Sequence, residues 1–154
     1  MSIEEINATT FGEFASKHVL KNFFQTKEYG ELMSHSDFSV MYIGAYHKDI
    51  LVAASLILYK ILSANIKYGY APRGFLVDFY NTDLLKAFTR KVKEFFLRRG
   101  FAFIKINPEI TYAVVNPENG SKNVNVNNIK IVDTLQNLGY LKLKDNLYFE
   151  SILP

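Results

Sequence analysis

The chain of 154 residues contains no cysteine. A disulfide framework and a thiolate metal site are therefore excluded, and a reducing compartment is permitted. Long apolar runs are missing too. The longest, residues 50–59, includes Ser55 and falls far short of the roughly 20 residues that a membrane helix needs. The first six residues have two glutamates and lack the cationic and apolar regions of a secretory signal.

Several sequence patterns of catalytic sites are also absent. His18, His35 and His47 are scattered, so neither a metal cluster nor a Ser-His-Asp triad can be assembled from local spacing. Walker-type and dinucleotide-binding fingerprints do not occur. The Arg/Gln-x-x-Gly-x-Gly/Ala run that cradles the pyrophosphate of coenzyme A at a helix N-terminus does not occur either. We therefore expect no metal site and no working acetyl-CoA site.

The composition is that of a packed globular protein. Hydrophobic residues make up 49% and aromatic residues 15%, with 10 tyrosines and 13 phenylalanines. A chain of this length buries about two thirds of its unfolded surface and predicts a single domain over residues 1–154. The net charge of +3 is compatible with anionic substrates and is weak evidence for nucleic-acid binding.

Hydrophobic spacing predicts four helices, over residues 11–19, 27–34, 83–99 and 126–138. Thr9 or Thr10 is expected to cap the first helix, with Glu13 completing a capping box. Gly100 and Gly139 are expected to end the last two helices.

Apolar and β-branched runs predict strands over residues 40–46, 50–62, 65–70 and 101–106, and a terminal hairpin over 140–144 and 147–152. Residues 47–49 read as a tight connection between the first two strands, and residues 116–125 as an exposed loop. The second strand is nearly continuous in its hydrophobicity, so it should be central and covered on both faces, and residues 101–106 should be buried. The order of elements predicts an α/β fold with a mixed, mostly antiparallel sheet and helices on both faces.

Residues 68–78 combine a turn, an arginine and a carboxylate between apolar segments. Pro72 fixes its own φ, and Gly74 tolerates angles that other residues resist, so a strand should end here in a sharp turn. Arg73 lies in that turn, where a guanidinium can bind a carboxylate or phosphate through two donors. Taken alone, Arg73 and Asp78 fit a solvated surface pair, or a turn residue followed by the N-terminal carboxylate of the next helix.

Together with its flanks, this stretch resembles the Fem family of peptidoglycan bridge-forming aminoacyltransferases. The resemblance covers most of the chain, and its segments occur in the order 22–32, 70–74 with Asp78, 103–108, 137–140 and 146–150. It implies a GNAT-like (acyl-CoA N-acyltransferase-like) fold. It also implies that the chain is the N-terminal half of a longer protein with two such subdomains. Because the second half supplies much of the acyl-donor site in the family, we expect this half alone to be inactive.

The resemblance implies transfer of an amino acid from aminoacyl-tRNA to the peptide stem of a peptidoglycan precursor, either UDP-MurNAc-pentapeptide or lipid II. Aminoacyl-tRNA would be the co-substrate, with no other cofactor, in the cytoplasm and with peripheral contact to the inner membrane face. Asp78, at the family's acidic position, would position or deprotonate the incoming amine. Arg73 and Tyr70 would line the precursor site, with Gln25 and Tyr29 beside it.

Two positions depart from the family pattern. Met33 stands where many relatives carry a basic residue at a phosphate-binding position, and Asn107 stands where relatives often have an aspartate. Both departures would suit an alternative function, a non-enzymatic GNAT-like module that binds a cell-wall peptide or a protein partner. A third possibility, an N-acyltransferase that uses coenzyme A, is disfavoured by the missing pyrophosphate loop.

Overall fold

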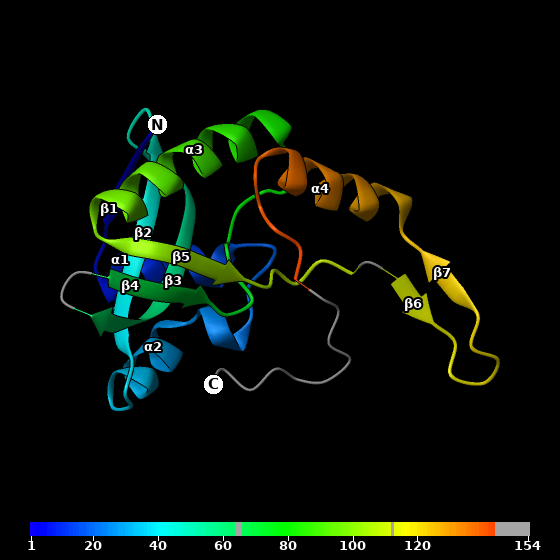
Figure 1. The fold of residues 1–154 in the computed structure, drawn as a ribbon, viewed down its shortest axis with the longest axis horizontal. Coiled ribbons are helices and arrows are strands. Elements are labelled where there is room, and N and C mark those ends of the chain that lie inside the picture. Colours follow the sequence, from blue (N-terminus) through cyan, green and yellow to red (C-terminus); the bar gives the residue numbers. More distant parts are fainter. Residues whose placement is uncertain (64–65, 112, 144–154) are drawn as a thin grey trace. The chain divides into compact units, whose positions relative to one another are not determined.

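The computed structural model of the protein describes residues 1–63, 66–111 and 113–143. These residues group into two compact units, Met1–Thr111 and Tyr112–Pro154, each of which is described by itself (Figure 1). The single domain expected from chain length stays a prediction.

The first unit is built on a five-stranded sheet in the order β1-β2-β3-β4-β5 (Figure 1). Neighbouring strands are antiparallel except β4 and β5, which are parallel. The strands are β1 (Ser2–Glu5), β2 (Ser39–His47), β3 (Ile50–Ser63), β4 (Ile66–Ala71) and β5 (Phe101–Ile106). The predicted mixed, mostly antiparallel sheet is therefore confirmed.

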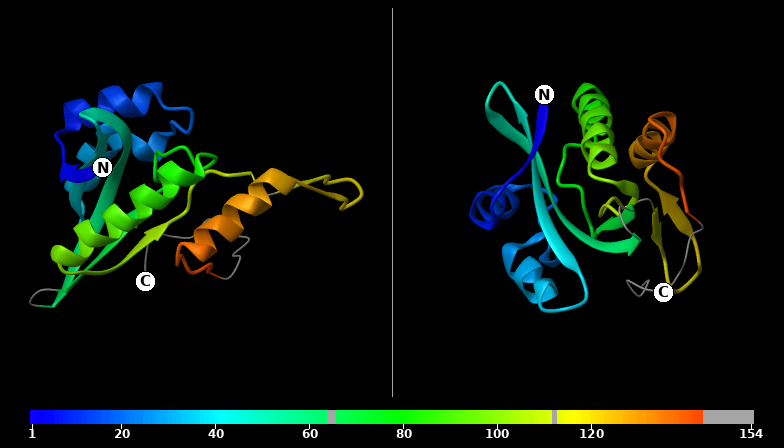
Figure 2. Two further views of the ribbon diagram at one scale, coloured as in Figure 1. Left: turned by 90° about the horizontal axis from the view of Figure 1, so that it is seen from above. Right: turned by 60° about the vertical axis from the view of Figure 1, so that its left-hand side comes forward.

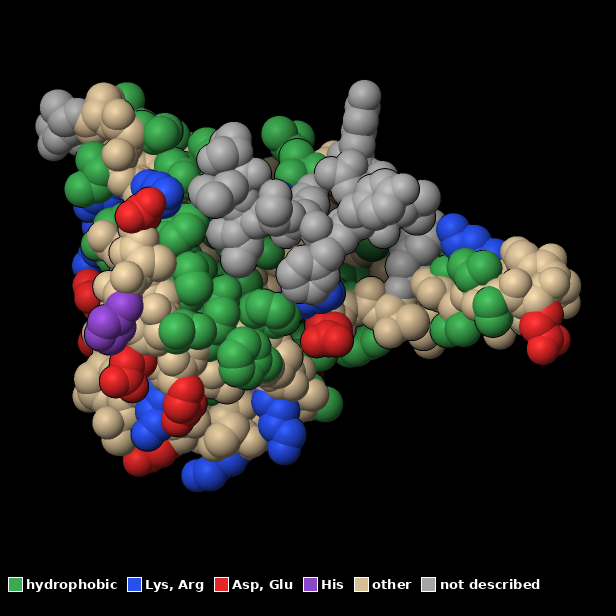
Figure 3. All heavy atoms as spheres, turned by 90° about the horizontal axis from the view of Figure 1, so that it is seen from below, with side chains coloured by type: hydrophobic (Ala, Val, Ile, Leu, Met, Phe, Trp, Pro, Cys, Tyr) green, Lys and Arg blue, Asp and Glu red, His purple; other side chains and the backbone are tan. Residues whose placement is uncertain are grey.

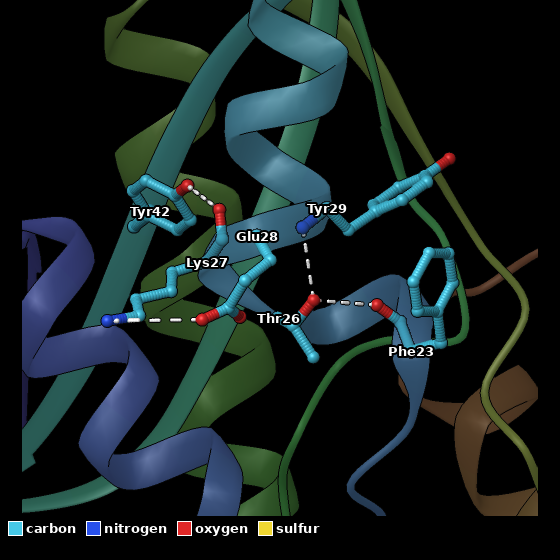
Figure 4. Close-up of polar contacts among 6 residues, drawn as sticks. All are labelled: Phe23, Thr26, Lys27, Glu28, Tyr29 and Tyr42. Atoms are coloured by element: carbon cyan, nitrogen blue, oxygen red, sulfur yellow. Dashed lines mark hydrogen bonds and ion pairs between the residues drawn. The ribbon is translucent and has the colours of Figure 1, made fainter.

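Helices cover both faces of this sheet, as predicted. Figure 2 shows α1 and α2 on one face and α3 on the other. The helical elements of the unit are α1 (Ala8–Lys17), the short 3₁₀ helix η1 (Phe23–Gln25), α2 (Lys27–Ser34) and α3 (Thr82–Arg98). The predicted bounds of α2 are confirmed, and the Thr26 hydroxyl caps it by accepting a hydrogen bond from Tyr29 N at 3.1 Å (Figure 4).

The predicted cap of the first helix was wrong. Asn7 is the N-cap of α1, and its side chain accepts a hydrogen bond from Thr10 N at 2.8 Å. The strand pairing explains the shift, because Ile6 N still donates to Tyr42 O at 2.9 Å. The chain therefore leaves the sheet directly into the helix, and Thr10 lies in the first turn.

The core of the unit lies around β3, whose residues 53–58 are each at most 1% exposed. This confirms the central strand expected from its hydrophobicity. The β2–β3 connection is the predicted tight hairpin, and Lys48 and Asp49 both take positive φ, of 49° and 63°. Such a pair of left-handed residues is typical of a turn that matches the twist of the flanking strands.

At the two edges of the sheet, one strand was not predicted and one expectation fails. Sequence reasoning missed β1, because the short polar segment shows no alternation of apolar residues. The expected burial of β5 is wrong: Phe101 is buried, whereas Phe103 is 56% exposed. An edge strand has a neighbour on one side alone, so an apolar run there does not imply burial.

The described residues of the second unit form a small hairpin and a helix. The elements are β6 (Ala113–Val115), antiparallel to β7 (Lys122–Val124), and α4 (Val126–Asn137). The expected loop over residues 116–125 is thus partly wrong, because it contains β7. Gly139 follows α4 with φ of 85°, the conformation expected of a helix-ending glycine. The predicted terminal hairpin lies mostly outside the described residues.

Candidate functional site

The sharp turn predicted after the third long strand is present at the end of β4. Gly74 N donates to Ala71 O at 3.1 Å, which closes the turn. Pro72 and Gly74 are buried, while Arg73 is half-buried and takes a left-handed φ of 51°. A residue with a side chain rarely adopts this conformation unless its surroundings hold it there.

After the turn the chain returns to the sheet. Leu76 and Ala54 exchange two backbone hydrogen bonds, of 3.0 and 3.1 Å, so residue 76 lies beside β3. Further along β3, Leu58 pairs with Tyr70 of β4. Leu56 lies on β3 between these two pairs, at a point where the strand next to β3 is interrupted.

The side chain of Gln25 fills this gap and is completely buried. Its Oε1 accepts from Leu56 N at 2.9 Å and from Ser55 Oγ at 3.2 Å. Its Nε2 donates to Leu56 O at 3.2 Å and to Pro72 O at 2.7 Å. The amide thus takes the place of a strand peptide and ties the turn to β3. A direct contact of Gln25 with substrate stays a prediction.

Two asparagines hold the peptide groups of Arg73 itself. Arg73 N donates to Asn107 Oδ1 at 2.7 Å, and Asn22 Nδ2 donates to Arg73 O at 3.3 Å. The Tyr70 hydroxyl also donates to Asn107 Oδ1, at 3.1 Å. We call Asn22, Gln25 and Asn107 the amide clamp. Sequence reasoning gave no structural role to the two asparagines, although both lie in segments that carry the family resemblance.

An aromatic cluster lies beside the turn. Tyr29 makes edge contacts with Phe23 and Phe24, with ring centroids 5.4 and 5.3 Å apart. Figure 4 shows the Phe23 ring beside that of Tyr29. Burial raises the pKa of the Tyr29 hydroxyl, and the neighbouring Tyr70 raises it further. Lys105 Nζ lies 5.8 Å from the centroid of the Tyr70 ring. The predicted site residues Tyr29, Tyr70 and Arg73 are therefore brought together.

Hydrophobic side chains gather on the face of the first unit shown in Figure 3, the side on which α2 lies in Figure 1. On η1 and α2, Phe23 is 63% and Leu32 is 61% exposed. Burying apolar surface of this kind against a ligand is favourable. The turn that carries Arg73 thus lies near the Lys105 ammonium group and the Tyr29 and Tyr70 hydroxyls. The exposed Phe23 directly follows Asn22, which binds Arg73 O.

Asp78 is exposed, and its Oδ1 accepts a hydrogen bond from Tyr80 N at 2.9 Å. It does not cap the following helix, because Asn81 is the N-cap of α3. Among the described residues, ion pairs join Lys27 to Glu28 and Lys91 to Glu94. Within that part of the chain, Arg73 and Asp78 therefore form no surface ion pair, contrary to the simplest interpretation of the sequence.

His18 is half-buried at the end of α1 and lies close enough to Asp78 to feel its charge. Its Nδ1 accepts from Leu20 N at 3.1 Å, which requires Nδ1 to be unprotonated. Leu20 O in turn accepts from Asn22 Nδ2 at 3.0 Å. His18 thus supports the segment that leads into the amide clamp.

We expect the stability of the protein to fall as His18 becomes protonated. Burial lowers the pKa of His18, and the attraction of Asp78 offsets part of this effect. The unfolded chain then binds a proton more readily, so the stabilisation is complete well above about pH 6.5 and is lost as the pH falls from there through the lowered pKa of the folded state. Urea unfolding of the wild type and His18→Gln between about pH 8 and pH 5.5 should show a smaller decline in the variant.

The exposed His47 provides the control for this experiment. His47→Gln also removes one imidazole, at an exposed position, so comparing the two variants separates the role of His18 from the loss of a histidine in general. Parallel curves for the wild type and His18→Gln would contradict the assigned role of His18.

The described residues offer no group of three or more potential ligands for a metal ion. Likewise, none of the described helices combines the length and apolar character that crossing a membrane requires.

The sheet, the helices on both its faces and the turn after β4 define a GNAT-like N-acyltransferase fold, as predicted. A solved aminoglycoside acetyltransferase, meta-AAC0020 from an uncultured soil metagenomic sample, matches with a TM-score of 0.55 and 11% identity, covering 99% of this chain and 96% of that chain. The crystal structure of FemX matches with a TM-score of 0.65 and 18% identity, covering 88% of this chain and 31% of FemX. Similarity at these identities establishes the fold.

The family follows from the sequence match. The FemAB family model matches residues 6–142, and the chain belongs to the FemAB family. Aminoacyltransferase FemA of Staphylococcus aureus (strain bovine RF122 / ET3-1) is 24% identical, over 99% of this chain and 36% of FemA. The protein of strain MW2 matches with the same identity and coverage. The chain thus spans about a third of the length of the curated relatives that it matches.

Proposed function

We propose that this chain is the acceptor-binding part of an aminoacyltransferase of peptidoglycan interpeptide-bridge synthesis. The reaction would transfer an amino acid from aminoacyl-tRNA to the peptide stem of a precursor, UDP-MurNAc-pentapeptide or lipid II. Membership of the FemAB family and the similarity to FemA support this proposal. Since the chain covers 36% of FemA, the activity belongs to a longer protein in this proposal.

The observation that carries the proposal is the turn around Arg73. Three amide side chains hold its backbone, so the position from which the guanidinium extends is fixed. The guanidinium takes part in no ion pair within the described ranges, which leaves its charge for a ligand. A diphosphate or a stem carboxylate of the precursor offers the matching anionic oxygens. Tyr29 and Tyr70 would add contacts at the same place.

Asp78 would act on the nucleophile of the reaction. The stem amine attacks the ester carbonyl of aminoacyl-tRNA, an amide bond forms and the ester C–O bond breaks. The tRNA leaves as a free hydroxyl, which takes up the proton that the amine loses. An exposed carboxylate can orient the amine by accepting its hydrogen bonds, and it can receive the proton. We place orientation of the amine first, because Asp78 is open to solvent.

The acyl donor in this proposal is aminoacyl-tRNA rather than acetyl-CoA. The segment between β4 and α3 makes its hydrogen bonds within the protein, because Leu76 N donates to Ala54 O of β3 and the Asn81 side chain caps α3. Asp83 adds a negative charge in the first turn of α3, where an anionic pyrophosphate would be disfavoured. A reaction between aminoacyl-tRNA and the peptidoglycan precursor would take place in the cytoplasm. Peripheral contact with the inner membrane face would accompany the use of lipid II.

The proposal is tested by titrating the protein with soluble UDP-MurNAc-pentapeptide. We expect saturable binding that Arg73→Ala weakens about tenfold, because one charge-assisted contact contributes roughly 1.5 kcal/mol. Asp78→Asn should weaken binding less. The control is Arg90→Ala, which removes an exposed arginine of α3, the helix on the face of the sheet opposite α1 and α2.

The outcomes separate clearly. Equal weakening by Arg73→Ala and Arg90→Ala would indicate a loss of general charge attraction and would overturn the assigned site. A folded wild type that does not bind would overturn the proposal that this part of the protein holds the acceptor.

A further inference from the structure

Exposed apolar side chains lie at the end of the sheet where β3 is followed by β4. Ile61 and Leu62 of β3 are both 62% exposed, and Ile66 of β4 is 48% exposed. Leu97, in the last turn of α3, is 76% exposed. We call these four residues the apolar tip.

The pairing of the strands brings α3 to this end of the sheet. Lys67 N of β4 donates to Gly100 O at 2.8 Å, and Gly100 directly follows Arg99, the C-cap of α3. In Figure 1 the end of β3, the start of β4 and the C-terminal end of α3 lie together on the left. The apolar tip therefore belongs to one end of the first unit.

Four cations accompany the apolar tip. Lys60 and Lys67 belong to the same ends of β3 and β4, and the exposed Arg98 and Arg99 end α3. The side chains of Lys60, Lys67 and Arg99 each lie over an aromatic ring, with the charged group 4.6, 5.6 and 3.7 Å from the ring centroid. These contacts hold the cations in place next to the apolar tip and leave their charge unchanged.

Acidic groups offset little of this charge. The segments of β3, β4 and β5 contain neither aspartate nor glutamate. Glu94, one turn before Arg98, is paired with Lys91 at 2.9 Å. Asp37 directly precedes Phe38, whose ring lies under Lys60. Even with Asp37 counted, this end of the unit keeps an excess of positive charge.

We propose that the apolar tip and its four cations form the surface by which the protein docks on an anionic lipid bilayer. The aliphatic side chains would enter the boundary between headgroups and acyl chains, and the cations would meet the lipid phosphates. This inference rests on the proposed function, in which a lipid-linked precursor brings the protein to a membrane, and it names the surface that makes the contact.

The kinds of side chain present favour a bilayer over RNA, the other anionic partner of the proposed reaction. RNA phosphates would bind the cations, but the four aliphatic side chains would stay in water, because bases stack on aromatic rings. A lipid interface accommodates both kinds of group.

The place of the apolar tip also leaves the precursor site open. Ile66 begins β4, whereas the turn that carries Arg73 follows its last residue, Ala71. Six residues of strand separate them, which is roughly 20 Å. An extended stem of five residues spans roughly 17 Å, so the stem of a lipid-linked precursor would approach the turn while the tip contacts the bilayer.

Sedimentation with lipid vesicles tests the inference without any precursor. We expect the wild type to bind vesicles that contain phosphatidylglycerol, and to bind vesicles of phosphatidylcholine alone at least about tenfold more weakly. Ile61→Ser should weaken binding to the anionic vesicles about fivefold, because it removes apolar surface from the contact. The matched control is Ile50→Ser, at the isoleucine that begins β3 and is 66% exposed, which should bind as the wild type does.

A second pair of variants tests the cations. Arg98→Gln with Arg99→Gln should weaken binding roughly 25-fold, because each cation near an anionic surface raises the affinity about fivefold. Lys86→Gln with Arg90→Gln removes the same charge from exposed positions nearer the start of α3 and should have a much smaller effect. Urea unfolding shows whether each variant is folded.

Two outcomes would overturn the inference. A folded wild type that binds neither kind of vesicle contradicts it. Binding that Arg98→Gln with Arg99→Gln abolishes but Ile61→Ser leaves unchanged would indicate a surface for polyanions such as RNA. The titration with soluble UDP-MurNAc-pentapeptide contains no lipid, so the proposed function stands or falls by that separate measurement.

Discussion

Replacing Gln25 with leucine is expected to lower the free energy of unfolding by about 4 kcal/mol. The substitution keeps a side chain of similar size in a site that is 0% exposed, but it removes every polar partner. Leu56 N and Pro72 O lose their hydrogen bonds to the amide, while Leu56 O keeps the one from Ser55 Oγ at 3.1 Å. Each buried group left unpaired costs roughly 1–3 kcal/mol. The loss is a large share of the 5–15 kcal/mol that stabilises a typical domain.

Urea unfolding followed by circular dichroism measures this effect. The matched control is Gln136→Leu, at the exposed glutamine of α4, which should change the free energy of unfolding by less than about 0.5 kcal/mol. If Gln25→Leu unfolds at nearly the wild-type urea concentration, the amide does not complete the sheet at Leu56. Arg73 would then need another explanation for its fixed turn.

The sequence predicts the elements of the first unit well where local patterns determine them. Hydrophobic spacing over residues 27–34 predicts α2 with its observed bounds, and the polar residues 47–49 between two apolar runs predict the β2–β3 hairpin. These signals are local, because a cap or a tight turn involves residues only a few positions apart. Edge strands lack such a signal, which is why β1 was missed and the burial of β5 was overestimated.

In the candidate site, too, the features with a local sequence signal could be predicted and the others could not. Pro72 and Gly74 predict the turn, and Arg73 lies between them. What holds the turn could not be predicted, because the clamp residues Asn22, Gln25 and Asn107 reach it from 51, 47 and 34 residues away. Single amide residues give no periodic pattern, and their partners are backbone atoms whose position depends on the whole sheet. The family resemblance indicated the segments that matter, and the structure shows the hydrogen bonds inside them.

Replacing Gly30 with alanine is expected to destabilise the protein by about 2–3 kcal/mol, although alanine is the better helix former. Helix propensity alone predicts a gain of about 1 kcal/mol in α2. A Cβ at position 30, however, would overlap the Tyr42 hydroxyl and would lie 2.8 Å from Leu56 Cδ1. Overpacking a closely filled core costs roughly 1–3 kcal/mol, and more where the neighbours cannot move.

Tyr42 has little freedom to move away from the added methyl group. Its hydroxyl donates to Lys27 O at 3.3 Å, as Figure 4 shows, and its ring lies 4.8 Å from that of Phe11, which is fully buried. The other neighbour, Leu56, belongs to the central strand and is also fully buried. The strain therefore cannot be relieved by one side-chain rotation, and it should appear in the free energy of unfolding.

The control for Gly30→Ala is Gly12→Ala in α1. There the nearest atom to a new Cβ is Lys27 Cδ at 3.2 Å, in a flexible side chain that can shift, so helix propensity should prevail and the variant should be as stable as the wild type or slightly more stable. Urea midpoints of the two glycine variants thus test packing against propensity within one protein. If both midpoints rise together, the close contact of α2 with β2 and β3 is contradicted. If Tyr42→Leu relieves the cost of Gly30→Ala in a double-mutant cycle, the Tyr42 ring is its source.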